Sequence, residues 1–136
     1  NNYVYEEAEN AIFIHRSRVG RTSANLAENP RVCYSVSEMG QLYTGASAQN
    51  FGVEYRSVVI FGTATLVDDQ AEARRVLQLF MDKYAPHLKS GVDYTPFTPE
   101  DAAHTAVYKI AIEQWSGKKR ERPADQLAYD FPPDEA

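Results

Sequence analysis

The chain is poor in cysteine, in long apolar runs and in net positive charge, and each absence excludes a class of protein. Its 136 residues include one cysteine, Cys33, so no disulfide can form within the chain. A lone thiol suits a reducing compartment, and we expect a cytoplasmic location. No apolar run approaches the roughly 20 residues of a membrane-spanning helix. No secretory signal is visible, and we expect no membrane association.

The charge balance also argues against nucleic acid as a partner. The net charge is -5 at pH 7, and no long basic stripe is present. Aromatic residues make up 12% of the chain, so a small barrel that stacks single-stranded nucleic acid is an alternative. The negative charge disfavours it. The three histidines have no cysteine or second histidine at ligand spacing, and we predict no metal site.

The remaining composition is that of one globular domain. Hydrophobic residues make up 43% and charged residues 24% of the chain, enough for a core. Residues 1–5 already resemble the middle of a strand, so we expect upstream residues, including an amino-terminal strand, to be missing. After Gly117 the chain becomes charged and proline-containing. We therefore expect a domain over 1–117 and an exposed tail over 118–136.

Apolar patterning predicts a mainly β protein. Two features stand out: the run 56–67 is apolar on both faces, which is typical of a fully buried or barrel strand, and Gly62 inside it indicates a bulge or bend. We expect turns at 7–10 and at Met39-Gly40, and a loop over 46–52. The predicted strands are 2–6, 11–15, 31–37, 41–44, 56–67 and 103–115.

Two segments have helical patterning. The first is 19–28, with Gly20 at its start and Asn29-Pro30 at its end. The second follows a cap at Asp68-Asp69 and stops at Pro86. Its apolar residues fall on one face: Ala73, Val76, Leu77, Phe80, Met81 and Tyr84. A short helical turn is expected in the loop that follows. Short strands with accessory helices predict a β-barrel.

The segment HRSRVGRTS, residues 15–23, joins a predicted strand to a predicted helix and has the parts of a phosphate site. The first turn of a helix has backbone N–H groups without partners, and its dipole favours an anion. Gly20 permits close approach of a ligand. The planar guanidinium of Arg21 can donate parallel hydrogen bonds to phosphate oxygens, and Thr22 and Ser23 add hydroxyl donors. The alternative is a solvated basic loop with an ordinary helix cap. Residue types alone leave both open.

Three blocks give the chain a family resemblance. IFIHRSRVGRTSANLAENPRVCYSV, EYRSVVIFGTATLVDD and KIAIEQWSGKK follow in the order found in the FMN-binding split barrels. The chain resembles the pyridoxamine 5'-phosphate oxidase-like family, and most of all its nitroimidazole-resistance branch. The resemblance implies a split β-barrel of the FMN-binding type. It also implies a homodimer with the cofactor at the subunit interface and a small-molecule substrate.

The resemblance also implies roles for single residues. Arg21 and Thr22 match the phosphate-binding positions, and the oxidases have a lysine where Thr22 stands. One charge is thus lost unless Arg16 or Arg18 replaces it. His15 matches a position beside the flavin and is the candidate catalytic residue. The residues predicted to bind the cofactor are Asn2, Tyr3, Val4, His15, Arg16, Arg21, Thr22, Ser23, Ser57 and Trp115; Trp115 would reach the flavin from the partner subunit.

Each role has a plain alternative. His15 can be a strand-end histidine satisfied by its neighbours, and Ser57 can simply begin a strand. Trp115 can belong to the core or to the dimer interface, and a buried inert thiol is the default for Cys33. Asp68-Asp69 is expected to be a helix cap and not a catalytic pair.

The leading functional hypothesis is an FMN-dependent oxidoreductase that reduces a nitro compound or another small electron-poor molecule. The alternative is a protein of the same fold that binds a flavin, haem or a deazaflavin without turnover.

Overall fold

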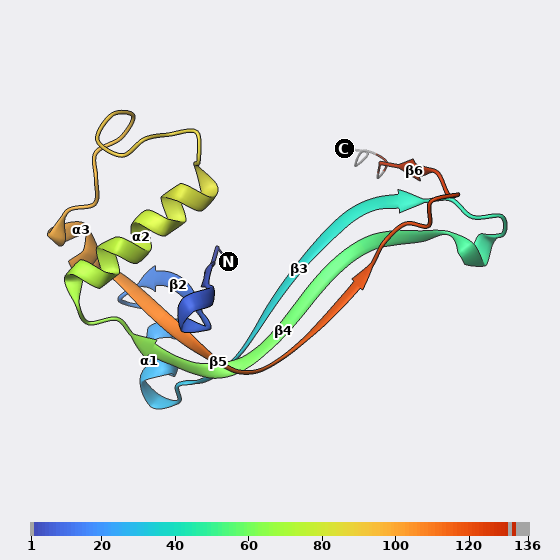
Figure 1. Cartoon of the computed structure of the whole chain (residues 1–136). Helices are drawn as coiled ribbons and strands as arrows, with labels where there is room; N and C mark the ends of the chain where they lie inside the picture. The colour runs from blue at the N-terminus through green and yellow to red at the C-terminus, as the bar shows by residue number, and fades with distance from the viewer. Residues whose placement is uncertain (1, 131, 133–136) are drawn as a thin grey trace. The chain divides into compact units, whose positions relative to one another are not determined.

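The computed structural model describes residues 2–130 and 132, and a six-stranded sheet dominates it (Figure 1). The strands lie in the order β1-β2-β5-β4-β3-β6. In chain order the elements are β1 (Val4–Glu6), a 3-10 turn (Glu7–Glu9), β2 (Ala11–Ser17), α1 (Arg21–Glu28), β3 (Arg31–Tyr43), a 3-10 turn (Ala48–Asn50), β4 (Gly52–Leu66), α2 (Gln70–Tyr84), α3 (Pro99–His104), β5 (Thr105–Arg120) and β6 (Ala128–Tyr129). The predicted class, mainly β with accessory helices, is confirmed.

The chain divides into two units. The first unit comprises Asn1–Val32 and Phe61–Gln114, and the second comprises Cys33–Ile60 and Trp115–Ala136. Strands β3, β4 and β5 each contribute residues to both units.

The first unit begins with the predicted hairpin of β1 and β2. Asn10 adopts the left-handed conformation, with φ of 46°, and its N–H donates to the Glu7 carbonyl at 3.0 Å. This turn sets Val4 opposite Phe13, and β2 then pairs antiparallel with β5. Asparagine tolerates this conformation better than most residues, which explains its place at the turn.

Helix α2 covers the core of the first unit. Asp69 caps it by accepting a hydrogen bond from the Glu72 N–H at 2.7 Å, as the sequence predicted. Four residues of the predicted apolar face are buried, Ala73, Val76, Leu77 and Phe80, whereas Met81 is half-buried and Tyr84 is 46% exposed. The four buried residues form one cluster with residues of β1, β2, α3 and β5, including Val4, Phe13, Ala102 and Val107. Full burial of a side chain such as Phe13 or Val76 contributes about 1.5–3 kcal/mol.

An ion-pair network ties the hairpin to α2. The Arg75 guanidinium donates to Glu6 at 2.8 and 3.0 Å and to Glu72 at 2.8 and 2.7 Å. These bonds lower the pKa of both carboxyl groups and raise the pKa of Arg75. Glu9 lies 4.0 Å from Arg75 and is also paired with Lys109 of β5. Three separate segments are therefore joined at one point.

The second unit has little core of its own. Among its described residues, only Tyr43 and Ile60 are buried hydrophobic residues. Strand β6 extends the sheet by pairing with β3, Leu42 opposite Tyr129 and Tyr43 opposite Ala128. Large apolar side chains remain exposed: Met39, Phe51, Trp115, Leu127 and Tyr129. Such a unit needs a further layer of secondary structure packed on it to bury its apolar side chains.

The structure corrects the predicted strand boundaries. Met39-Gly40 is not a turn, because β3 continues through it to Tyr43 and includes both predicted strands. A Cβ on Gly40 would lie 3.0 Å from the Glu54 Cβ, so this glycine provides close packing against β4. Strand β4 begins at Gly52, and it is not fully buried, since Phe61 is 51% exposed.

Gly62 also has a packing role. A Cβ at this position would lie 2.1 Å from the Ala111 carbonyl oxygen of β5. Glycine is therefore required here by the approach of a neighbouring backbone.

The carboxy-terminal residues that the structure describes are mostly exposed. Strand β5 runs on to Arg120, past the predicted domain end at 117, and most of residues 118–130 are exposed. Residues 1, 131 and 133–136 lie outside the described residues, and so does the end of the predicted tail. Over the described part of the chain, no helix is both long and apolar enough to cross a membrane.

Candidate functional site

The junction between β2 and α1 is an open loop held by its own serines. The Ser17 hydroxyl accepts a hydrogen bond from the Val19 N–H at 3.2 Å. The Ser23 hydroxyl donates to the Ser17 carbonyl at 2.9 Å, which ties the helix to the end of the strand. Gly20 has a φ of 144°, which residues with a side chain rarely adopt, and no atom lies within 4 Å of the place a Cβ would occupy. The loop therefore leaves space above the helix start.

The amino end of α1 fits an anion. No side chain caps it, and its first intrahelical bond runs from the Ala24 N–H to the Gly20 carbonyl at 3.1 Å. Arg21 and Thr22 are exposed in the first turn. The Arg21 guanidinium forms no hydrogen bond or ion pair within residues 2–130 and 132. Uncapped N–H groups, the helix dipole and an unpaired guanidinium together favour a phosphate or carboxylate.

Arg16 has an unsatisfied donor in the same region. It is half-buried on β2, opposite Ala106 of β5, and its Nε atom is buried without a hydrogen-bond partner. Buried donors are normally paired, so this Nε is open to an outside polar group, although Arg74 Nε on α2 is buried and unpaired in the same way. This observation supports Arg16 as the source of the second charge that Thr22 does not supply.

His15 lies beside Arg16, and its imidazole packs against α2. The rings of His15 and Phe80 meet edge to face, with centroids 4.8 Å apart and an interplanar angle of 89°. His15 is exposed as a whole, but partial burial of its imidazole, and secondarily the charge of Arg16, lower its pKa below the usual 6.5. The side chain is thus mainly neutral at pH 7, with one nitrogen able to donate and one able to accept a proton.

The amino-terminal segment is attached to the same helix. The Tyr3 N–H donates to the Tyr84 hydroxyl at 3.0 Å. The Tyr3 carbonyl accepts from Lys83 Nζ at 2.7 Å and from the Tyr84 hydroxyl at 3.1 Å. Val4 is in the core and Asn2 is exposed. Of these three residues, Tyr3 is the one whose backbone is fixed by α2.

The other two predicted cofactor residues lie in the second unit. Ser57 is half-buried on β4, and Trp115 on β5 is 69% exposed, so it is not a core residue. A Cβ on Gly117 would lie 3.4 Å from the Trp115 ring and 3.7 Å from the Ser57 carbonyl, so these residues are neighbours. Cys33 is exposed, which corrects the expectation of a buried thiol.

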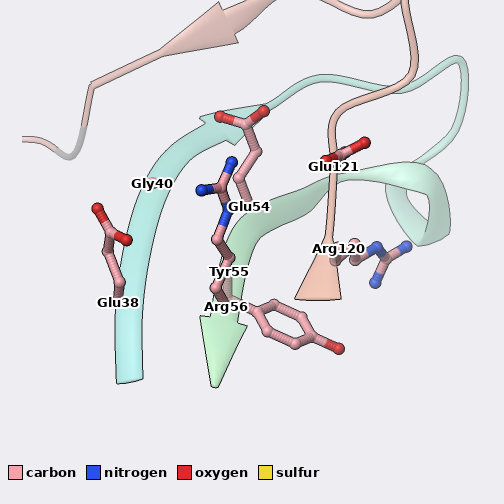
Figure 2. A pocket seen from close by; sticks show the side chains of 7 residues that line it. All are labelled: Glu38, Gly40, Glu54, Tyr55, Arg56, Arg120 and Glu121. Atoms are coloured by element: carbon pink, nitrogen blue, oxygen red, sulfur yellow. The ribbon is translucent and has the colours of Figure 1, made fainter. Parts of the chain in front are cut away.

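The second unit also contains a pocket of about 180 Å³ that the sequence did not indicate (Figure 2). Both carboxylate oxygens of Glu54 are engaged, by the N–H groups of Gln41 at 3.4 Å and Arg122 at 3.2 Å. Glu121 pairs with Lys119 at 3.1 Å, and that hydrogen bond lowers the pKa of Glu121. The lining residues are Glu38, Gly40, Glu54, Tyr55, Arg56, Arg120 and Glu121, and none is a predicted site residue.

Sequence reasoning missed three residues of α2 that contact the predicted site: Phe80, Lys83 and Tyr84. Phe80 and Tyr84 stood on the predicted apolar face, and such spacing indicates a core. No local signal revealed that their partners are His15 and Tyr3. Among the residues that the structure describes, no group of three His, Cys, Asp or Glu side chains is placed to hold a metal ion.

A family model matches most of the chain. Residues 1–119 match the model described as pyridoxamine 5'-phosphate oxidase. No curated protein sequence matches the chain.

Solved structures of other proteins have a similar fold. A protein of Bacteroides thetaiotaomicron named for 5-nitroimidazole antibiotic resistance has a TM-score of 0.68 and 21% identity; the match covers 85% of this chain and 64% of that one. The flavocytochrome Anf3 of Azotobacter vinelandii has a TM-score of 0.69 and 25% identity, with 98% and 67% covered. An FAD- and haem-binding protein of Mycobacterium smegmatis has a TM-score of 0.73 and 22% identity, with 98% and 74% covered. The chain thus spans just under two thirds of the first of these proteins.

Proposed function

Because this chain belongs to the pyridoxamine 5'-phosphate oxidase family and has its split β-barrel fold, we propose that it binds a flavin, with FMN as the first candidate. We further propose that it acts as an oxidoreductase on a small electron-poor molecule such as a nitro compound. The observation that carries the proposal is the uncapped start of α1, where Arg21 has no partner among the described residues.

The flavin phosphate would be held by the first turn of α1. Arg21 offers two parallel N–H groups to phosphate oxygens, and Thr22 offers a hydroxyl. The hydrogen of the Ser23 hydroxyl is already used on the Ser17 carbonyl, so Ser23 shapes the loop more than it donates to a ligand. Arg16 would supply the second positive charge through its unpaired Nε.

A bound flavin supplies the electron transfer, and the protein supplies binding and proton control. His15 is suited to proton control because its lowered pKa keeps the imidazole neutral at pH 7. A neutral imidazole can hold a proton at one nitrogen and accept one at the other. A small substrate beside His15 would therefore meet a proton donor that does not need to be charged.

A homodimer is part of the proposal. The second unit exposes Trp115 and other large apolar side chains, and its described residues bury little of their own surface. A second copy of the chain would provide the missing layer and present Trp115 to the partner's flavin. A cytoplasmic location is also proposed, because the one thiol is free.

The visible absorption spectrum of the purified protein, before and after addition of FMN and of FAD, tests the proposal. We expect a flavin spectrum and saturable binding of one flavin per chain. A colourless protein that binds neither compound would contradict flavin binding.

A second candidate function is binding without turnover. The observation behind it is that two of the similar structures are named as a flavocytochrome and as an FAD- and haem-binding protein, names that point to ligand binding. A haem or deazaflavin spectrum, or bound flavin without turnover of reduced nicotinamide and a nitro acceptor, would support it.

A further inference from the structure

The last turn of α2 contacts two parts of the candidate site that are separate in sequence. Phe80 packs edge to face on His15 at 4.8 Å. Phe80 also lies parallel to Tyr84, with centroids 6.4 Å apart and an interplanar angle of 16°. Tyr84 and Lys83 hold the backbone of Tyr3. A continuous row of side chains therefore runs from His15 to Tyr3 within the first unit.

Tyr3 lies just before β1, and two side chains of α2 contact it. One hydroxyl, that of Tyr84, accepts from the Tyr3 N–H and donates to the Tyr3 carbonyl. The Lys83 ammonium lies 3.4 Å from the centroid of the Tyr3 ring and 5.0 Å from that of the Tyr84 ring. Cation–π contacts at these distances are attractive. Tyr3 is thus fixed through both its backbone and its ring.

The hairpin register places these two contacts at the same end of β2. Val4 pairs with Phe13, so the antiparallel register carries Tyr3 towards Ile14, the neighbour of His15. The carboxy-terminal end of α2 contacts both residues, Tyr3 through Lys83 and Tyr84, and His15 through Phe80. Two of the residues predicted to bind the cofactor, His15 and Tyr3, are therefore held by one helix.

We propose that Phe80, Lys83 and Tyr84 are positioning residues, which hold His15 and Tyr3 in place at the proposed flavin site. The inference rests on the proposed function, because it assigns these α2 residues a role at that site. None of the three needs to touch the reacting atoms. Each acts through the residue that it holds.

The first test is Tyr84→Phe, which keeps the ring stacked on Phe80 and removes the hydroxyl that binds Tyr3. We expect FMN to bind about tenfold more weakly, because both hydrogen bonds from this hydroxyl to the Tyr3 backbone are lost and their net contribution is of this order. We also expect the absorption bands of bound FMN to shift, a change that lower stability alone does not produce. The matched control is Tyr94→Phe, which removes a hydroxyl bonded to Gln78 on the same helix at 2.8 Å.

The second test is Phe80→Leu, which keeps an apolar residue but removes the ring beside His15. Arg16 is unchanged, so any rise in the pKa of His15 reports lost burial by Phe80. We expect NMR titration of the imidazole to show the pKa moving up towards 6.5, with Tyr94→Phe unchanged.

The outcomes separate this inference from the proposed function. If wild-type protein binds no flavin, the proposed function fails, but two measurements on the flavin-free protein remain decisive. These are the His15 titration in Phe80→Leu and hydrogen exchange of the Tyr3 amide in Tyr84→Phe. Unchanged values in both, or unchanged FMN affinity and spectrum in Tyr84→Phe when the wild type binds FMN, would overturn the positioning role. If Phe80→Leu does not fold, the Tyr84→Phe measurements decide.

Discussion

Arg21 is a guanidinium in the first turn of a helix with no side-chain cap, and it has no partner among the described residues. Its removal should leave the fold unchanged and the proposed phosphate site weaker. We predict that Arg21→Ala lowers FMN affinity by about 2 kcal/mol, the range of a charge-assisted hydrogen bond. Isothermal titration calorimetry measures this.

The matched control for Arg21 is Arg31→Ala, because Arg31 is also exposed but lies on β3, outside the loop. Its FMN affinity should equal that of the wild type. Equal affinities for Arg21→Ala and Arg31→Ala would remove Arg21 from the site.

The lowered pKa of His15 predicts how the stability of the fold depends on pH. Its pKa in the folded chain lies below the unfolded value of 6.5, so the unfolded state binds more protons between the two values. The contribution of His15 to stability is therefore complete above pH 6.5 and declines as pH falls through the folded pKa. Urea unfolding of wild-type protein and of His15→Gln across this range measures it. The wild type should lose more stability on acidification than the variant, and parallel curves would contradict the shifted pKa.

Single residues also show what the sequence could predict. Gly20, Arg21 and the cap at Asp69 depend on neighbours close in the chain, and their local structure was predictable. Whether Arg21 holds a phosphate is still a prediction. Phe80 and Tyr84 could not be recognised as site neighbours, because Tyr84 contacts a residue 81 positions away. A helical apolar face indicates burial but not the identity of what it covers.

Among the elements, α2 and the β1–β2 hairpin are joined by Arg75. Because Arg75 donates to both Glu6 and Glu72, those two carboxyl groups have lowered pKa values. Their contribution to stability is present above the ordinary value of 4.5 and is lost as pH falls through the lowered values. The ion-pair network should therefore contribute little to stability once the pH has fallen below the lowered pKa values of Glu6 and Glu72.

We predict that Arg75→Met lowers the free energy of unfolding by about 1 kcal/mol at pH 7, the upper range for exposed pairs. The loss should shrink below pH 4.5, where the carboxylates become protonated in the wild type as well. Lys119→Met removes an isolated exposed pair and should change stability little. A loss for Arg75→Met that is the same at all pH values would argue against ion pairing as its cause.

Element boundaries were predicted well where turns are local and poorly where glycine served a distant contact. The turn at 7–10 and the end of α2 before Pro86 were correct. Gly40 appeared to be a turn signal, but it lies within β3 because the Glu54 side chain approaches it. That partner is on another strand, so no pattern around residue 40 contains the information.

At the scale of the whole molecule, the proposed dimer explains why the second unit exposes so many apolar side chains. We predict that Trp115→Glu weakens self-association, because a charge at a desolvated interface is unfavourable. Val92→Glu is the control, since Val92 is 80% exposed on a loop of the first unit. Light scattering coupled to gel filtration measures the mass of each variant. A wild-type protein that elutes as a monomer at all concentrations would contradict the dimer.

The exposed position of Cys33 has a practical consequence for that question. It is the one thiol in the sequence, and it lies on β3 at the start of the second unit. A maleimide or nitroxide reagent will therefore label each copy of this chain at one defined site. Two spin labels in a dimer give a single distance by pulsed electron resonance, so the proposed assembly can be measured without an engineered cysteine.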